Sequence, residues 1–227
     1  MRRTRIKICG LTREADVDHA AAAGADAIGF VLYRASPRHV SVQRAAELAR
    51  RLPAFVTPVL LFVNATADEV AAGLEAVPNA LLQFHGDETP DQCAALAGPR
   101  PWMRAARVPV GAGAAGFDLL EYAQRFAAAR AVLIDAHVPG YGGGGQPFDW
   151  TAFPWSHPRL NAADRVVLSG GLTPANVTDG VRLVRPWAVD VSSGVEAAKG
   201  IKDPARVEAF IAAVRRADLT PTDPPHP

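Results

Sequence analysis

One pattern recurs eight times along this chain: a short run of apolar, β-type residues precedes a longer stretch whose apolar residues have helical spacing. The short runs are rich in Val, Ile and Leu, as is typical of parallel strands that are covered on both faces. The expected strands cover 5–9, 26–31, 55–63, 80–84, 101–108, 131–135, 165–169 and 187–192. Eight such units in 227 residues predict an α/β fold, a single closed (β/α)8 TIM barrel.

The alternative to the barrel is a doubly wound open sheet, because hydrophobic spacing does not show whether a sheet closes. We expect the barrel domain to cover residues 1–217, whose last helix carries apolar residues three and four positions apart. The remaining segment, 218–227, has no such periodicity and contains four prolines, so we expect a disordered tail.

Several helix boundaries are indicated by residues that commonly cap helices. Side chains that accept a hydrogen bond from a first helical turn stand before four of the expected helices, at Thr12, Ser41, Thr89 and Thr173. Pro174 is expected to be the first residue of its helix, and Gly24 is expected to end the first helix of the chain.

The charge distribution argues against nucleic acid and membranes as partners. Net charge is +1 and the basic residues are dispersed, whereas nucleic-acid binding rests on clustered Lys and Arg. The basic start resembles a signal peptide, but its apolar run ends at Gly10, and the apolar stretch 54–63 is too short to span a bilayer. We therefore expect a cytoplasmic protein.

The two cysteines, Cys9 and Cys93, do not make a disulfide framework, and no Cys/His spacing indicates a structural metal. Cys93 lies within a helical pattern and is expected to fill the core. Cys9 ends the first strand, where a free cysteine is either a small buried side chain or a catalytic group.

Catalytic groups of such a barrel project from the C-terminal ends of the strands and the loops after them. Cys9 ends the first strand, His85 follows the fourth, and Asp135 ends the sixth. A carboxyl group at such a position suits a general acid, and a helix cap or a structural hydrogen bond is the alternative. His85 is similarly either a ligand-binding or a structural histidine.

Two glycine-rich turns follow the seventh and eighth strands. They contain Gly170, Gly171, Ser192, Ser193 and Gly194. Glycines let backbone N–H groups approach a ligand, and loops in these two positions form the usual phosphate site of phosphate-binding barrels. The alternative is a pair of tight turns that only need positive φ.

Two further loops carry candidate ligand contacts. The segment 139–150 contains Gly142, Gly143, Gly144 and Gly145, which suggests a cover over a ligand, a backbone contact with one, or a floppy connection. The loop after the second strand carries Arg38, whose planar guanidinium suits a carboxylate ligand, although a solvated arginine is the alternative.

The chain resembles a known family in motifs that occur in order from residue 5 to about residue 216. The motifs are IKICGLT, GFVLYRASPRHVS, FVN, LLQFHG, LIDAHVPGYGGGGQPFDW, LSGGLTPANV and RPWAVDVSSGVE. In this combination they are similar to the phosphoribosylanthranilate isomerases, the (β/α)8 enzymes of tryptophan biosynthesis.

The resemblance implies an Amadori rearrangement of N-(5-phosphoribosyl)anthranilate without cofactor or metal, in a monomer or a homodimer. By position, Cys9 is then the general base and Asp135 the general acid. Arg38 falls where the family contacts the anthranilate carboxylate, and the two glycine-rich turns, with the glycines at 142–145, fall where it holds the phosphate. Gln83 and His85 match the family motif at the substrate site, while His137 receives no role.

We further expect the helix that follows Cys9, capped by Thr12, to favour the thiolate through its positive end. Two other kinds of protein remain as alternatives: another phosphosugar barrel enzyme, and a non-catalytic module that binds a phosphate ligand. A histidine-pathway isomerase would use two carboxylates, and an indole-glycerol-phosphate synthase a lysine acid, for which Lys7 stands at the wrong element of the motif.

Overall fold

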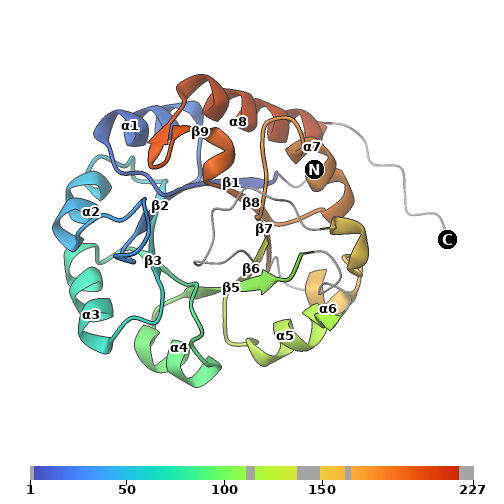
Figure 1. Ribbon diagram of the computed structural model, residues 1–227, viewed down its shortest axis with the longest axis horizontal. Helices are drawn as coiled ribbons and strands as arrows, with labels where there is room; N and C mark the ends of the chain where they lie inside the picture. Colours follow the sequence, from blue (N-terminus) through green and yellow to red (C-terminus); the bar gives the residue numbers. More distant parts are fainter. Residues whose placement is uncertain (1–2, 111–115, 137–148, 162–164, 220–227) are drawn as a thin grey trace.

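The computed structural model describes residues 3–110, 116–136, 149–161 and 165–219. Within them, eight parallel strands close into a barrel in which each strand pairs with the next and the eighth pairs with the first (Figure 1). The strands are β1 (Arg5–Cys9), β2 (Ala27–Val31), β3 (Thr57–Phe62), β4 (Leu81–Phe84), β5 (Trp102–Val108), β6 (Ala131–Ala136), β7 (Val166–Leu168) and β8 (Ala188–Val191). The predicted barrel is confirmed, and the open sheet is excluded.

A ring of helices surrounds the strands (Figure 1). These are α1 (Glu14–Ala23), α2 (Val42–Ala49), α3 (Ala67–Ala76), α4 (Pro90–Ala97), α5 (Leu119–Arg125), α6 (Pro158–Asn161), α7 (Val177–Val184) and α8 (Pro204–Leu219), with short 3-10 turns at η2 (Trp150–Ala152) and η3 (Ser193–Val195). Because α8 packs against α1, the first and last helices close the outer ring. Helix α8 continues to Leu219, two residues past the predicted end of the domain, and residues 220–227 lie outside the described residues.

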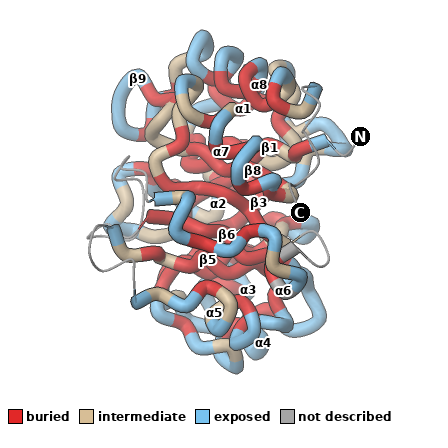
Figure 2. Tube along the Cα trace, turned by 90° about the vertical axis from the view of Figure 1, so that its right-hand side faces the viewer, coloured by how far each residue is buried: buried red, intermediate tan, exposed pale blue. Residues whose placement is uncertain are grey.

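Apolar side chains fill the barrel in two layers. Alternate residues such as Ile6 and Ile8 point outward and join the large core between strands and helices. A smaller cluster fills the interior of the barrel: Val59, Met103, Ala105, Ala131, Leu133, Val167 and Ala188. Figure 2 shows the buried strands between helices whose outer sides are exposed. The strands therefore form a rigid frame that fixes where each strand-end side chain points.

The predicted caps are partly confirmed. The side chains of Ser41 and Thr89 accept hydrogen bonds at the starts of α2 and α4, and Gly24 ends α1 in a left-handed conformation with φ of 102°. The Thr12 prediction is wrong, because α1 begins at Glu14 without a side-chain cap, and the Thr12 hydroxyl donates to the carbonyl of Gly200 instead.

The start of α7 also differs from the prediction. The helix begins at Val177, so Pro174 lies in the preceding turn, and Asn176 rather than Thr173 is its N-cap. Asn176 accepts from the backbone N–H of Thr173 through its side-chain oxygen. This turn leaves several residues between β7 and the helix, and the glycine-rich segment occupies them.

An antiparallel hairpin that the periodicity did not predict follows β8. It consists of β9 (Glu196–Ala198) and β10 (Ile201–Lys202) and lies between α1 and α8 in Figure 1. Its Lys202 backbone N–H donates to Asp16 of α1, which ties the hairpin to the barrel wall. The hairpin thereby carries Glu196 and Lys202 back to the end of β1.

Candidate active site

Polar side chains gather on the inner face of the barrel at the C-terminal ends of the strands. Cys9 and Asp135 stand at the ends of β1 and β6, and His85 directly follows β4, with all three side chains buried. Gln83 lies two residues before His85, so it points to the same side of its strand. The strand register thus brings the predicted catalytic and ligand-binding positions to one end of the barrel.

Asp135 and His85 form the first part of this site. His85 Nε2 lies 3.2 Å from Asp135 Oδ2, although the two atoms do not meet the geometry of a hydrogen bond. Gln83 Nε2 lies 3.1 Å from His85 Nδ1, so the amide orients the ring from below. Among the described residues, neither Gln83 Oε1 nor His85 Nε2 has a hydrogen-bond partner. These two atoms can therefore hydrogen-bond to a ligand in the space beside the Asp135 carboxyl group.

Cys9 forms the second part. Gly29 lies opposite it on β2, and a Cβ at Gly29 would stand 2.7 Å from Cys9 Sγ, so only glycine leaves room for the thiol. Burial raises the pKa of the Cys9 thiol, and the positive charge of Lys7 acts against that rise. The expected Thr12 cap of α1 is absent, and the expectation that the helix end favours the thiolate stays a prediction.

Arg38 reaches the same end of the barrel but already has a carboxylate partner. Its Nε and Nη2 atoms donate to the two oxygens of Glu196, each over 2.7 Å, in a buried bidentate pair. Lys202 Nζ donates to the same carboxylate over 2.9 Å. Burial alone would raise the pKa of Glu196, but its hydrogen bonds and ion pairs with Arg38 and Lys202 outweigh burial and lower it. Glu196 therefore holds both cations in fixed positions.

The glycine-rich turns after β7 and β8 touch each other. Gly170 and Gly171 have φ of 73° and 72°. These values are compatible both with tight turns that only need positive φ and with turns that also bind a ligand. A Cβ at Gly194 would stand 1.9 Å from the carbonyl oxygen of Leu172, which shows how closely the two loops approach. Ser193 begins the turn η3. The predicted phosphate-binding residues are thus neighbours in space.

Ser192 links this region to Cys9. Its hydroxyl donates to the backbone carbonyl of Cys9 over 3.0 Å, and its own carbonyl accepts from Lys202 Nζ over 3.1 Å. Gly10 fits between them, since a Cβ there would stand 2.5 Å from Arg38 Cδ and 3.1 Å from Ser192 Oγ. The other predicted positions, Gly142, Gly143, Gly144, Gly145 and His137, lie outside the described residues.

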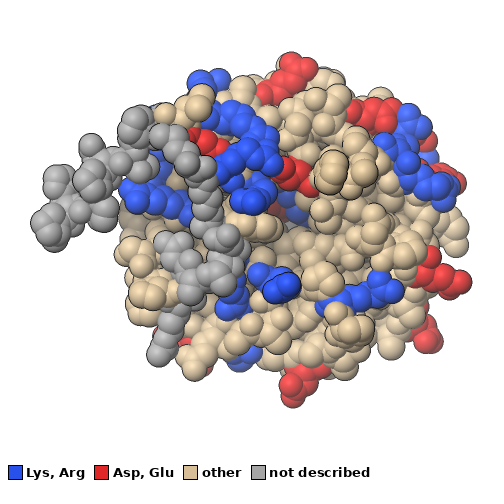
Figure 3. All heavy atoms as spheres, turned by 180° about the vertical axis from the view of Figure 1, so that it is seen from behind, with Lys and Arg blue, Asp and Glu red and all other residues tan. Residues whose placement is uncertain are grey.

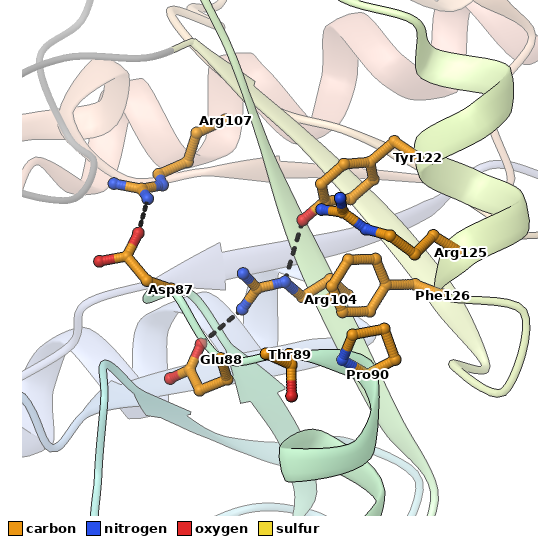
Figure 4. A pocket seen from close by; sticks show the side chains of 9 residues that line it. All are labelled: Asp87, Glu88, Thr89, Pro90, Arg104, Arg107, Tyr122, Arg125 and Phe126. Carbon is orange, nitrogen blue, oxygen red and sulfur yellow. Dashed lines mark hydrogen bonds and ion pairs between the residues drawn. The ribbon is translucent and has the colours of Figure 1, made fainter.

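A buried network holds the loop that carries His85 and Gly86. Glu88 accepts from the backbone N–H of Gly86 and of Asn64, and Arg104 donates to Glu88, to Gly86 O and to the Tyr122 hydroxyl. Figure 4 shows Arg104 between Glu88 and Tyr122 at the edge of a cavity of about 400 Å³. The inward end of this network fixes the position from which His85 approaches Asp135.

Four functional candidates were missed by sequence reasoning: Lys7, Asp190, Glu196 and Lys202. The sequence could have indicated the first two, because side chains two residues apart on a strand point to the same face. Lys7 precedes Cys9 by two residues, and Asp190 precedes Ser192 by two. No local signal identified Glu196, whose partner Arg38 lies 158 residues away in sequence.

Within the described parts of the chain, the side chains form no cluster typical of a metal site, and no helix suits a membrane span. There, no three His, Cys, Asp or Glu side chains come together to hold a metal ion. None of the helices described is both long enough and apolar enough to cross a membrane. On the face shown in Figure 3, Lys and Arg side chains stand in separate groups with Asp and Glu beside them, rather than forming one continuous basic surface.

Comparison with known proteins identifies the family. The model of the family "N-(5'phosphoribosyl)anthranilate (PRA) isomerase" matches residues 6–213, which is nearly the whole barrel. The chain belongs to this family. It is similar to the N-(5'-phosphoribosyl)anthranilate isomerase of Leptothrix cholodnii, with 62% identity over 221 residues that cover 97% of this chain and 95% of the relative. The relative from Methylibium petroleiphilum is also 62% identical, over 95% of this chain and 96% of its own.

Solved structures of the family agree with the architecture. Phosphoribosyl anthranilate isomerase from Thermotoga maritima superimposes with a TM-score of 0.81 at 36% identity, over 94% of this chain and 99% of that one. A phosphoribosyl anthranilate isomerase in complex with reduced 1-(o-carboxyphenylamino)-1-deoxyribulose 5-phosphate gives a TM-score of 0.78 at 34% identity, over the same shares. The family fold and the barrel described above are therefore the same.

Proposed function

We propose that this chain is a phosphoribosylanthranilate isomerase of tryptophan biosynthesis. It converts N-(5-phosphoribosyl)anthranilate into 1-(2-carboxyphenylamino)-1-deoxyribulose 5-phosphate. The observation that carries the proposal is family membership along residues 6–213, with relatives 62% identical over nearly the full chain. The buried Cys9 and Asp135 at one end of the barrel support it, because moving a proton between two carbons requires an acid and a base.

Asp135 is the proposed general acid. In its protonated form it gives its proton to the furanose ring oxygen while the bond from that oxygen to C1 breaks, and the ring opens to a Schiff base. His85 Nε2 lies 3.2 Å from Asp135 Oδ2, so the imidazole borders the carboxyl group at the inner wall without hydrogen-bonding to it. Gln83 fixes the histidine in turn through its contact with Nδ1.

Cys9 is the proposed general base. As a thiolate it removes the proton from C2 of the Schiff base, which gives an enolamine, and tautomerisation of the enolamine yields the ketone. The reaction is an isomerisation, so no atoms or electrons leave the substrate and no cofactor or metal is required. A thiol of raised pKa must first lose its proton in this buried place, and neighbouring cations lower the cost.

The remaining residues bind the substrate. Backbone groups of Gly170, Gly171, Ser193 and Gly194, beside the Ser192 hydroxyl, are the proposed phosphate contacts, together with the glycines at 142–145. Their closely touching loops support this assignment. Arg38 is the proposed contact of the anthranilate carboxylate. Because Glu196 holds its Nε and Nη2, we expect the carboxylate to approach the remaining Nη1.

The decisive experiment gives purified protein freshly made phosphoribosylanthranilate and follows the loss of its fluorescence. Cys9→Ala and Asp135→Asn should each reduce kcat by at least about a hundredfold, while Cys93→Ala, a buried cysteine elsewhere, is the matched control and should keep activity. An inactive wild type would defeat the enzyme proposal. Full activity in either site variant would defeat its assigned role, and binding without turnover would favour the non-catalytic module.

The proposal includes a cytoplasmic location and a monomer or homodimer. One solved structure of a relative is described as mutually generated monomers of the dimeric phosphoribosylanthranilate isomerase from Thermotoga maritima. Sedimentation equilibrium of this chain over a range of concentrations distinguishes the two states.

A further inference from the structure

A buried ion pair lies directly beneath Cys9. Lys7 precedes Cys9 by two residues on β1, so both side chains point into the barrel, and the strand register places Lys7 beside Asp190 of β8. Lys7 Nζ lies 2.8 Å from Asp190 Oδ1, with only 5% and 7% of the two side chains exposed. Asp190 Oδ2 also accepts from the Ser169 hydroxyl over 3.3 Å. The carboxylate is therefore held from two sides and holds the ammonium in turn.

The Lys7 ammonium group and the Cys9 thiol lie close together beside Gly29. A Cβ at Gly29 would stand 2.7 Å from Cys9 Sγ and 3.1 Å from Lys7 Nζ, so both atoms border the volume that glycine leaves empty. The two atoms are therefore less than about 6 Å apart, close enough for an opposite charge to stabilise an ionised group. A water-poor barrel interior strengthens that effect relative to the surface.

We propose that Lys7 is a positioning residue for the isomerisation: Asp190 holds its ammonium beside Cys9, where it stabilises the thiolate that takes the substrate proton. The inference rests on the proposed role of Cys9 as general base. Lys7 does not touch the substrate. Its positive charge acts only by stabilising the negative charge of Cys9.

Other charged groups also face Cys9, and they favour Lys7 as the main stabilising charge. Asp190 opposes the thiolate, while Lys202 and Arg38 favour it. Arg38 and Lys202 are both committed to Glu196, whose negative charge offsets theirs.

The two lysines near Cys9 differ in how firmly they hold their protons. Burial lowers the pKa of Lys202 despite Glu196. Burial also acts to lower the pKa of Lys7, but Asp190 and Cys9 outweigh it and raise that pKa. Lys7 therefore holds its proton more firmly than Lys202 does.

The first test removes the charge of Lys7 without leaving Asp190 as a lone buried carboxylate. The double variant Lys7→Met/Asp190→Asn is compared with Lys7→Arg, both in a Cys93→Ala background so that Cys9 is the only thiol. The ultraviolet absorbance of the thiolate against pH gives the Cys9 pKa, and kcat and KM are measured over the same pH range.

The double variant should raise the apparent pKa of Cys9 by about one unit, which is about a tenfold loss of thiolate at a given pH. kcat should fall by the same factor and recover as pH rises, with KM within about twofold, and Lys7→Arg should retain the wild-type pH profile. A folded double variant with an unshifted thiol pKa would overturn the proposal. A uniform loss of kcat at every pH would also overturn it, because that is the mark of a structural role.

A second measurement needs no change at Lys7. In protein labelled with ¹³C at lysine Cε, the Lys7 resonance should shift with the same midpoint as Cys9 ionisation, and the shift should vanish in Cys9→Ser. A Lys7 resonance that does not respond overturns the proposal even if the double variant does not fold. Since neither titration uses substrate, an inactive wild type would defeat the proposed function while the Lys7–Cys9 coupling is still measured.

Discussion

The second cysteine, Cys93, provides a stability test that is independent of the active site. It lies in α4 with no exposed surface, and burial raises the pKa of its thiol to about 11, from an ordinary value of 9.0. Arg104 acts against this rise and Glu88 adds to it. The folded protein therefore prefers the neutral thiol more strongly than the unfolded chain does, and its stability must depend on pH in the alkaline range.

The sign and the size follow from the two pKa values. A folded-state pKa above the unfolded one contributes stability that is fully present below about pH 9 and is lost as pH rises towards 11. Two pH units at about 1.4 kcal/mol each amount to about 3 kcal/mol, a large part of the roughly 5–15 kcal/mol typical of a domain. Cys93→Ala removes the thiol and leaves a small cavity, which costs about 1–2 kcal/mol near neutral pH.

Urea unfolding of wild type and Cys93→Ala, followed by circular dichroism with a reductant present, measures the difference at a series of pH values. Near neutral pH the wild type should be the more stable protein. The difference should shrink above about pH 9, and near pH 11 the order should reverse, because the loss of about 3 kcal/mol exceeds the cost of the cavity. A difference that stays constant across this range would refute the reasoning, since all other titrating groups are common to both proteins.

Two further substitutions test the substrate side of the barrel. Gly194→Ala places a Cβ 1.9 Å from the Leu172 carbonyl oxygen, so the two loops proposed to bind phosphate must separate. KM should rise by about tenfold or more, an effect of about 1.4 kcal/mol, while the circular dichroism spectrum stays unchanged. An unaltered KM would contradict the phosphate assignment. Glu196→Gln leaves Arg38 and Lys202 buried without a carboxylate and should cost about 3–5 kcal/mol in urea unfolding. A cost below about 1 kcal/mol would mean that solvent already screens the three groups.

The fold was predictable because its information is local and repeated. Each strand is covered on both faces and each helix on one, so apolar spacing distinguishes them. Eight such units favour a barrel, but its closure is shown only by the pairing of β8 with β1. Boundaries were less predictable where a long-range contact competes with a local cap. Thr12 has the right chemistry to cap α1, but its hydroxyl donates to Gly200 of the hairpin after β8. No residue near Thr12 in the sequence predicts a contact with Gly200, which is 188 residues away.

The candidate site divides in the same way. The rule that barrel sites lie at C-terminal strand ends made Cys9, Asp135 and His85 candidates, and only the family resemblance assigned their roles. The partners of these groups depend on how distant segments meet. Arg38 was expected to present its fork to a ligand carboxylate, yet Glu196, from a hairpin absent from the periodicity, occupies two of its nitrogens.

The electrostatics of Cys9 show why a local argument fails at this position. A helix N-terminus was expected to favour the thiolate, but a helix dipole contributes only about 0.3–1 kcal/mol at its own first turn. Burial of the thiol acts in the opposite direction and outweighs the neighbouring cations, so the pKa of Cys9 rises. A nearby full charge is the strongest remaining means of compensation, and β1 itself supplies one at Lys7, two residues before Cys9. An unpaired lysine in the barrel would tend to lose its proton, so the compensation also requires Asp190, which only closure of β8 onto β1 brings alongside.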